Sequence, residues 1–118
     1  MKTTQKKAIE AYNTLIGIGN KASGDPAFTL FNLKLELRNI FEFQTEEENK
    51  LIRKYDAKVT PDGRIIIEDK QKNEEFGREY MQLGELECEI NEVEVPRSGV
   101  PGITLNEIEA LYGFVHFV

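Results

Sequence analysis

Apolar residues in the first part of the chain recur at spacings of three and four, which is the period of an amphipathic helix. Thr3 or Thr4 precedes this stripe and can cap the helix. A helix with one apolar stripe buries it against another element, so a packing partner is expected. The stripe consists of Ala8, Ile9, Tyr12, Leu15 and Ile16.

A glycine-rich turn ends this helix, and a second, longer helix is predicted over about residues 27–55. Asp25 followed by Pro26 is typical of an N-cap and a first helical position. The alternation around residues 31–37 also fits a strand, but the helical spacing continues as far as Tyr55 through good helix formers. The two helices would form an αα-hairpin, and the second would be roughly 43 Å long.

The second helix carries aromatic residues on more than one side. Either the helical hairpin buries them on several sides, which we favour, or an apolar strip stays free for a partner. Because of this second alternative, a homodimer is one of the partner hypotheses. The residues are Phe28, Phe31, Phe41 and Phe43.

The middle of the chain predicts a small β-hairpin followed by a third helix. Pro61, Asp62 and Gly63 form a turn between β-branched residues. Asp69 can cap the third helix, and Gly84 is placed to end it. The apolar positions of this helix are Phe76, Tyr80 and Leu83.

Residues 86–95 alternate between apolar and acidic side chains, which predicts an acidic strand. The alternation slips by one residue at Asn91, so a bulge or a break is expected there. Thr104 and Glu107 form a capping box that opens a short C-terminal helix. The apolar tail, residues 114–118, either packs on the core or is a docking surface.

Together these elements predict a single domain, residues 1–118, of the α+β class and mainly α. Its expected parts are an N-terminal αα-hairpin with a long second helix, a small β-hairpin, a third helix, an acidic strand and a short C-terminal helix. A chain of 118 residues has the length of one ordinary domain.

Negative charge is concentrated at the carboxy-terminal end. Residues 1–84 hold 14 basic and 14 acidic side chains, whereas residues 85–118 hold seven Glu and one Arg and so carry the whole net charge of −6. Such a segment would repel phosphates, so direct nucleic-acid binding is not expected. The glutamates could instead imitate phosphates and enter a basic groove on a partner. The alternative that we favour is a solvated strand face.

The sequence gives no support for catalytic or metal-binding chemistry. The single Cys88 lies between two glutamates, whose charges would raise its pKa and oppose thiolate chemistry. The single His116 lacks partners for a catalytic triad or a zinc site, so we expect it to pack at the C-terminus. No apolar run is long enough to span a membrane. We therefore expect no enzyme activity, no cofactor, no metal and no membrane partner.

Short motifs follow one another in a distinctive order along nearly the whole chain. They are Ala11-Tyr12-Asn13-Thr14-Leu15, Glu46-Glu47-Glu48-Asn49-Lys50-Leu51-Ile52-Arg53-Lys54-Tyr55, Asp62-Gly63, Glu75-Phe76, Glu92-Val93-Glu94-Val95 and Ile103-Thr104-Leu105-Asn106-Glu107-Ile108. In this order they resemble a family of small, largely uncharacterised proteins encoded by tailed phages and prophages. The resemblance implies a protein made in the cytoplasm of a bacterial host, and it supports the helix over residues 27–55. It implies no catalytic residues.

The function that we expect is protein–protein interaction by a phage-encoded accessory protein with a structural or assembly role. Its partner would be a phage or a host protein. Two alternatives stay open, namely an inhibitor of a host defence system that presents an acidic surface to a basic groove, and a sponge for a small ligand. The binding residues expected are Glu87, Glu89, Glu92 and Glu94 in the acidic strand and Phe114 and Phe117 in the tail.

Overall fold

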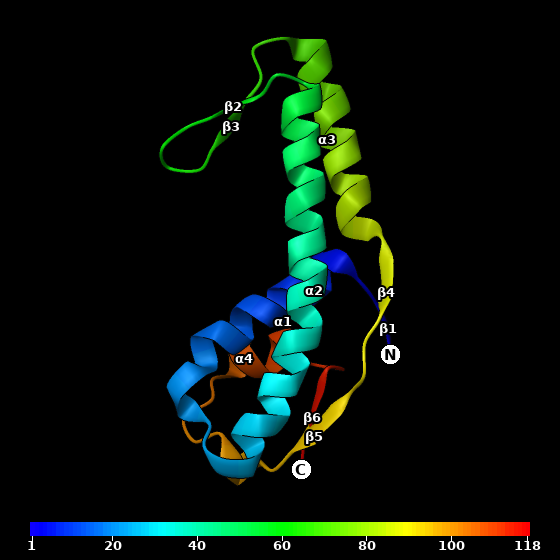
Figure 1. Ribbon diagram of the computed structural model, residues 1–118. Coiled ribbons are helices and arrows are strands. Elements are labelled where there is room, and N and C mark those ends of the chain that lie inside the picture. Colours follow the sequence, from blue (N-terminus) through cyan, green and yellow to red (C-terminus); the bar gives the residue numbers. More distant parts are fainter.

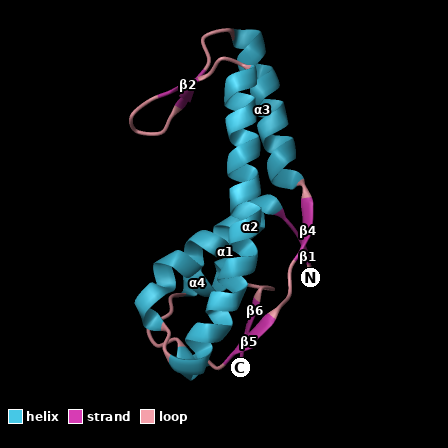
Figure 2. Cartoon of the chain, in the orientation of Figure 1, coloured by secondary structure: helices cyan, strands magenta, loops and turns pink.

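The computed structural model describes residues 1–118 and consists mainly of four α-helices, with three two-stranded sheets (Figures 1 and 2). This confirms the predicted α+β, mainly α, class. In chain order the elements are β1 (Lys2–Thr4), α1 (Gln5–Ile18), α2 (Gly24–Lys54), β2 (Lys58–Val59), β3 (Ile65–Ile66), α3 (Lys70–Glu85), β4 (Glu87–Glu89), β5 (Val93–Val95), α4 (Leu105–Ala110) and β6 (Val115–Phe117), with short 3-10 turns at Gly19–Lys21 and Arg97–Gly99.

The long helix α2 divides the molecule into two regions (Figure 1). We call residues 1–40 and 86–118 the body, where the first half of α2 packs with α1 and β5, and α4 packs on α1. We call residues 41–85 the stalk, where the second half of α2 runs antiparallel to α3. The radius of gyration is 16.8 Å, against about 13.5 Å for a compact chain of this length. The difference arises because the stalk extends the molecule to 52 × 29 × 21 Å.

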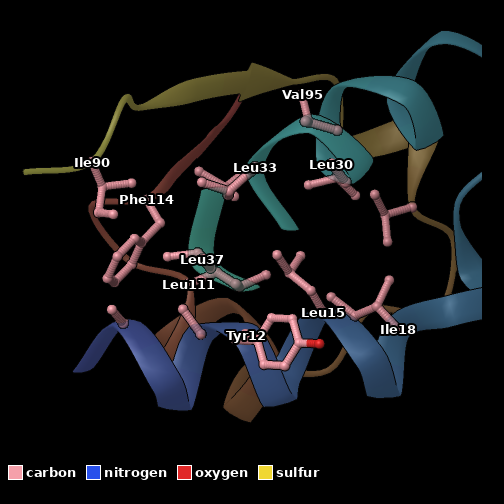
Figure 3. Packing of buried hydrophobic residues seen from close by; sticks show 14 residues of the cluster. Tyr12, Leu15, Ile18, Leu30, Leu33, Leu37, Ile90, Val95, Leu111 and Phe114 are labelled. Carbon is pink, nitrogen blue, oxygen red and sulfur yellow. The ribbon is translucent and has the colours of Figure 1, made fainter. Parts of the chain in front are cut away.

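The body holds the main hydrophobic core, a cluster of 14 buried residues that includes none from the stalk (Figure 3). Helix α1 contributes Ala8, Tyr12 and Leu15 of the predicted stripe together with Ala11 and Ile18. Ile9 and Ile16 of the predicted stripe lie outside the cluster, and Ile16 is half exposed, because they sit at the edge of the buried face. Helix α2 contributes Leu30, Leu33 and Leu37 from the face that meets α1. The C-terminal part of the chain supplies the remaining wall, which includes Ile90, Val95, Val100, Leu111, Phe114 and Val115. Burying each side chain of this kind contributes about 1.5–3 kcal/mol.

The predicted helix starts are confirmed for α1, α3 and α4. The Thr4 hydroxyl accepts a hydrogen bond from the Lys7 amide, and the Asp69 carboxylate accepts one from the Lys72 amide. At α4 both hydrogen bonds of the capping box form, because Thr104 and Glu107 each accept from the other's backbone amide. These signals are local, so the sequence alone is sufficient to place them.

Helix α2 begins before the position predicted for it. Its N-cap residue is Ser23 rather than Asp25, and Pro26 is the third helical residue. Proline fits there because the first four amides of a helix have no partner within the helix. Ser23 makes no side-chain cap hydrogen bond.

The segment predicted as one acidic strand is two short strands in two different sheets. Strand β4 pairs antiparallel with β1, and β5 pairs in parallel with β6. Of the two alternatives at Asn91, the break is the one observed, and the Asn91 amide donates to the Glu36 carboxylate at 3.1 Å. Strand β1 was not predicted, because three residues are too few to show an alternation.

The predicted β-hairpin forms at the distal end of the stalk, where β2 and β3 pair only with each other (Figure 1). Gly63 closes its turn with φ of +86°, a conformation that favours glycine. Below the hairpin, Tyr55 and Phe76 pack edge to face, and Phe76 stacks on Tyr80. None of the helices is both long and apolar enough to cross a membrane.

Candidate interaction surfaces

The predicted glutamates lie along one side of the body, on the segment that runs from the end of α3 to β5 (Figure 1). Glu87 and Glu89 belong to β4, Glu94 belongs to β5, and Glu92 lies just before β5. All four side chains are exposed. We call these four residues the acidic edge.

Basic groups neutralise the acidic edge in part. Lys2 is the partner of Glu89 in the β1–β4 register. The His116 Nε2 atom lies 2.9 Å from Glu92 Oε2, and this hydrogen bond lowers the pKa of Glu92. Glu87, Glu89 and Glu94 make no ion pair within the chain. His116 is therefore an exposed partner of Glu92 and not the packed residue that was expected.

The C-terminal tail is packed on the core, which answers the question that the sequence left open. Phe114 is only 3% exposed and belongs to the core cluster, so it is not available as a docking residue. Phe117 is half-buried against the same cluster. The tail is fixed in place because β6 pairs with β5, and the Val118 amide donates to the Val95 carbonyl at 3.0 Å.

An apolar strip lies on the solvent side of the first half of α2. Phe28 is 71% exposed, Phe31 is 49% exposed and Leu35 is 38% exposed. They occupy the face opposite Leu33 and Leu37, which point into the core. We call Phe28, Phe31 and Leu35 the α2 strip. The expectation that the aromatic residues of α2 are buried is thus wrong, and the strip is the alternative that is observed.

A shallow groove continues the α2 strip toward α1. Phe31 and Lys34 form one wall of it, and the end of α1 forms the other. Its lining is mostly apolar and comprises Leu15, Ile18, Gly19, Ala22, Ala27, Leu30, Phe31 and Lys34. The sequence contained a signal for the strip, because positions 28, 31 and 35 follow the three-and-four spacing of a helix interface.

The hairpin is a second exposed apolar surface. Val59 and Ile65 are cross-strand partners and therefore share one face of the β2–β3 ladder. Val59, Ile65 and Ile66 are all exposed. The turn could be predicted from the sequence, but the exposure of its strands could not, because β-branched residues usually mark a buried face.

The structure places few reactive side chains where they could act as a nucleophile or hold a metal ion. Burial raises the pKa of the Cys88 thiol, so burial, rather than the neighbouring glutamates, opposes thiolate formation. Cys88 packs against the core cluster, as expected of a small core residue. No group of three or more His, Cys, Asp or Glu side chains is arranged to hold a metal ion.

Comparison with known proteins adds no relative to these observations. No family model, no curated protein and no solved structure matches the chain.

Proposed function

We propose that the chain is a phage-encoded accessory protein that binds another protein, with a structural or assembly role in the bacterial cytoplasm. The observation that best supports a binding role is the exposed hairpin at the end of the stalk. The phage origin rests on the motifs quoted from the sequence, such as Glu92-Val93-Glu94-Val95.

The hairpin has the properties of a partner-binding element. A two-stranded hairpin alone is marginally stable in water, and it gains stability by adding a strand or packing on another surface. Both β2 and β3 have a free edge, and free edges can pair with a strand of another chain. The apolar pair Val59 and Ile65 would be covered in the same step. We therefore propose a partner protein that offers an open sheet edge.

The test is capture of partners from lysates of infected or lysogenic cells, followed by mass spectrometry and by binding measurements with the purified partner. The double substitution Val59→Asp and Ile65→Asp should reduce affinity at least 100-fold, because it places two charges in the contact. Gln71→Glu with Asn73→Asp is the matched control, since it adds the same charge at exposed positions of α3. Unchanged capture by the hairpin variant would refute the proposal, provided that its circular dichroism matches the parent.

A second candidate is an inhibitor of a host defence system that presents the acidic edge to a basic groove. It is favoured by the three glutamates that make no ion pair within the chain, Glu87, Glu89 and Glu94. Binding of this kind weakens steeply with salt. Charge reversal at Glu89, Glu92 and Glu94 together should then abolish capture while the hairpin substitutions leave it intact.

A further inference from the structure

The α2 strip is an apolar surface that the rest of the chain leaves uncovered. Taking about 200 Å² for a Phe side chain, the exposed fractions of Phe28, Phe31 and Leu35 amount to roughly 300 Å² of apolar surface. Interfaces are about 56–65% apolar. With its polar flanks the strip can therefore supply about 500 Å² per copy. A pair of copies would bury about 1,000 Å² in total, which is the size that a specific interface needs to reach.

We infer that the occupant of the α2 strip is the same strip of a second copy, with the two α2 helices antiparallel. Positions 28, 31, 35, 38 and 42 follow the alternating three-and-four spacing of an interhelical seam. An antiparallel pair with its two-fold axis beside residue 33 places Phe31 opposite Leu35 of the other copy, and Phe28 opposite Arg38. One self-complementary contact therefore covers Phe28, Phe31 and Leu35 of both copies.

The charged residues of the seam fit the same register. Arg38 is half-buried and makes no ion pair within the chain, and Glu42 is exposed and likewise unpaired. A guanidinium over the face of Phe28 gains a cation–π contact. Glu42 comes to lie beside the first turn of the other α2, whose N-cap residue Ser23 leaves the backbone amides without a side-chain acceptor.

This register leaves the stalk hairpin free. The two stalks point in opposite directions from the shared seam, so each dimer presents a hairpin at either end. The dimer is independent of the proposed partner, because it requires only the purified protein. Its test therefore separates a failure of the dimer from a failure of the proposed function.

Analytical ultracentrifugation of the full chain from 1 to 200 µM tests the dimer. The expected result is a concentration-dependent shift from 13.5 kDa to twice that mass within this range. Phe31→Glu with Leu35→Glu should raise the dissociation constant at least 100-fold. Phe43→Glu is the matched control, because Phe43 is an exposed aromatic residue of the same helix that lies off the seam. A parent protein that stays monomeric throughout overturns the inference.

Cross-linking tests the register in a background with Cys88→Ala. In the antiparallel pair, Asn32 lies beside Asn32 of the second copy, with an offset of about 3 Å along the helix axis. Asn39 is offset from Asn39 of the second copy by about 18 Å. With a short bis-maleimide, Asn32→Cys should give covalent dimers and Asn39→Cys should not. Equal cross-linking of both variants would indicate parallel helices and would overturn the register. Efficient cross-linking of Asn39→Cys alone would overturn it as well.

Discussion

The body and the stalk share helix α2, yet they are stabilised by different means. In the body, α2 presents Leu33 and Leu37 to a core that draws on residues from both ends of the chain. In the stalk, α2 has one helical partner, and the buried residues are few: Gln44, Tyr55, Phe76 and Leu83. The same helix is therefore one wall of a core in its first half and one member of a simple helix pair in its second. Regions with few buried apolar contacts open more readily than a core, so we expect the stalk to open while the body stays folded.

The largest effect is expected in the body core. Leu37 of α2 is fully buried between α1 and the C-terminal segment, so Leu37→Ala should lower the free energy of unfolding by about 3 kcal/mol. Urea denaturation followed by circular dichroism measures this. Ile16→Ala is the control, because Ile16 is half exposed on α1, and it should cost much less. A loss below 1 kcal/mol for Leu37→Ala would contradict the role assigned to the body core.

A smaller and local effect is expected for Phe76→Ala. Phe76 contacts Tyr55 and Tyr80, and these aromatic contacts hold the end of the stalk together. Its removal should cost about 2 kcal/mol, less than for the core of a domain because the stalk can relax into the space. Amide hydrogen exchange should accelerate in α3 and in the end of α2 and stay unchanged in α1. Equal acceleration in α1 would mean that body and stalk unfold as one unit, which would contradict the expected difference in stability between the two regions.

The smallest effect is expected from acid. The Lys54 ammonium, 2.9 Å from Glu79, and the Tyr55 hydroxyl lower the pKa of Glu79 in the stalk. Lys21, 2.7 Å from Glu107, is the main cause of the lowered pKa of Glu107 in the body. A carboxyl with a lowered pKa in the folded state stabilises the fold at pH values above its unfolded pKa, which is about 4.3 for Glu. This contribution is lost as the pH falls through the lower, folded value.

Hydrogen exchange between pH 5 and 3 can assign these contributions to the two regions. Glu79→Gln should flatten the acid dependence of protection in α3 and at the end of α2, whereas Glu107→Gln should do so in α4 and leave the stalk unchanged. Glu74→Gln is the control, because Glu74 is exposed and makes no ion pair. An acid response of α3 that is unchanged by Glu79→Gln would show that other carboxyls dominate.

Features encoded by neighbouring residues could be predicted from the sequence. The caps at Thr4, Asp69 and Thr104 depend on residues within one turn, and the Gly63 turn depends on four residues. The long helix was also predicted, because its apolar spacing persists for many turns. These signals were sufficient to define the fold class.

Features that depend on distant residues could not be predicted. Strand β1 forms only because β4, more than 80 residues later, offers a partner edge. The exposure of Phe28 depends on which face of α2 the rest of the chain covers, and periodicity does not say this. Phe114 looked like a candidate for docking because a tail of apolar residues has the same composition whether it is buried or free. The four glutamates of the acidic edge are exposed, as a solvated strand face would be, but the pairing of Glu92 with His116 was not predicted.

The segment from β4 to β5 pairs with a strand from each end of the chain, because β4 pairs with β1 and β5 pairs with β6. Pairing Thr3 with Cys88 closes a loop of about 85 residues, at an entropic cost of about 4 kcal/mol. The few hydrogen bonds of a three-residue ladder, each worth about 1 kcal/mol net, do not offset that cost alone. The β1–β4 pair therefore becomes stable only after α1 and α3 have both packed on α2 and brought the two strands together. The pair therefore stabilises a body that has already assembled, and it does not initiate the folding of the body.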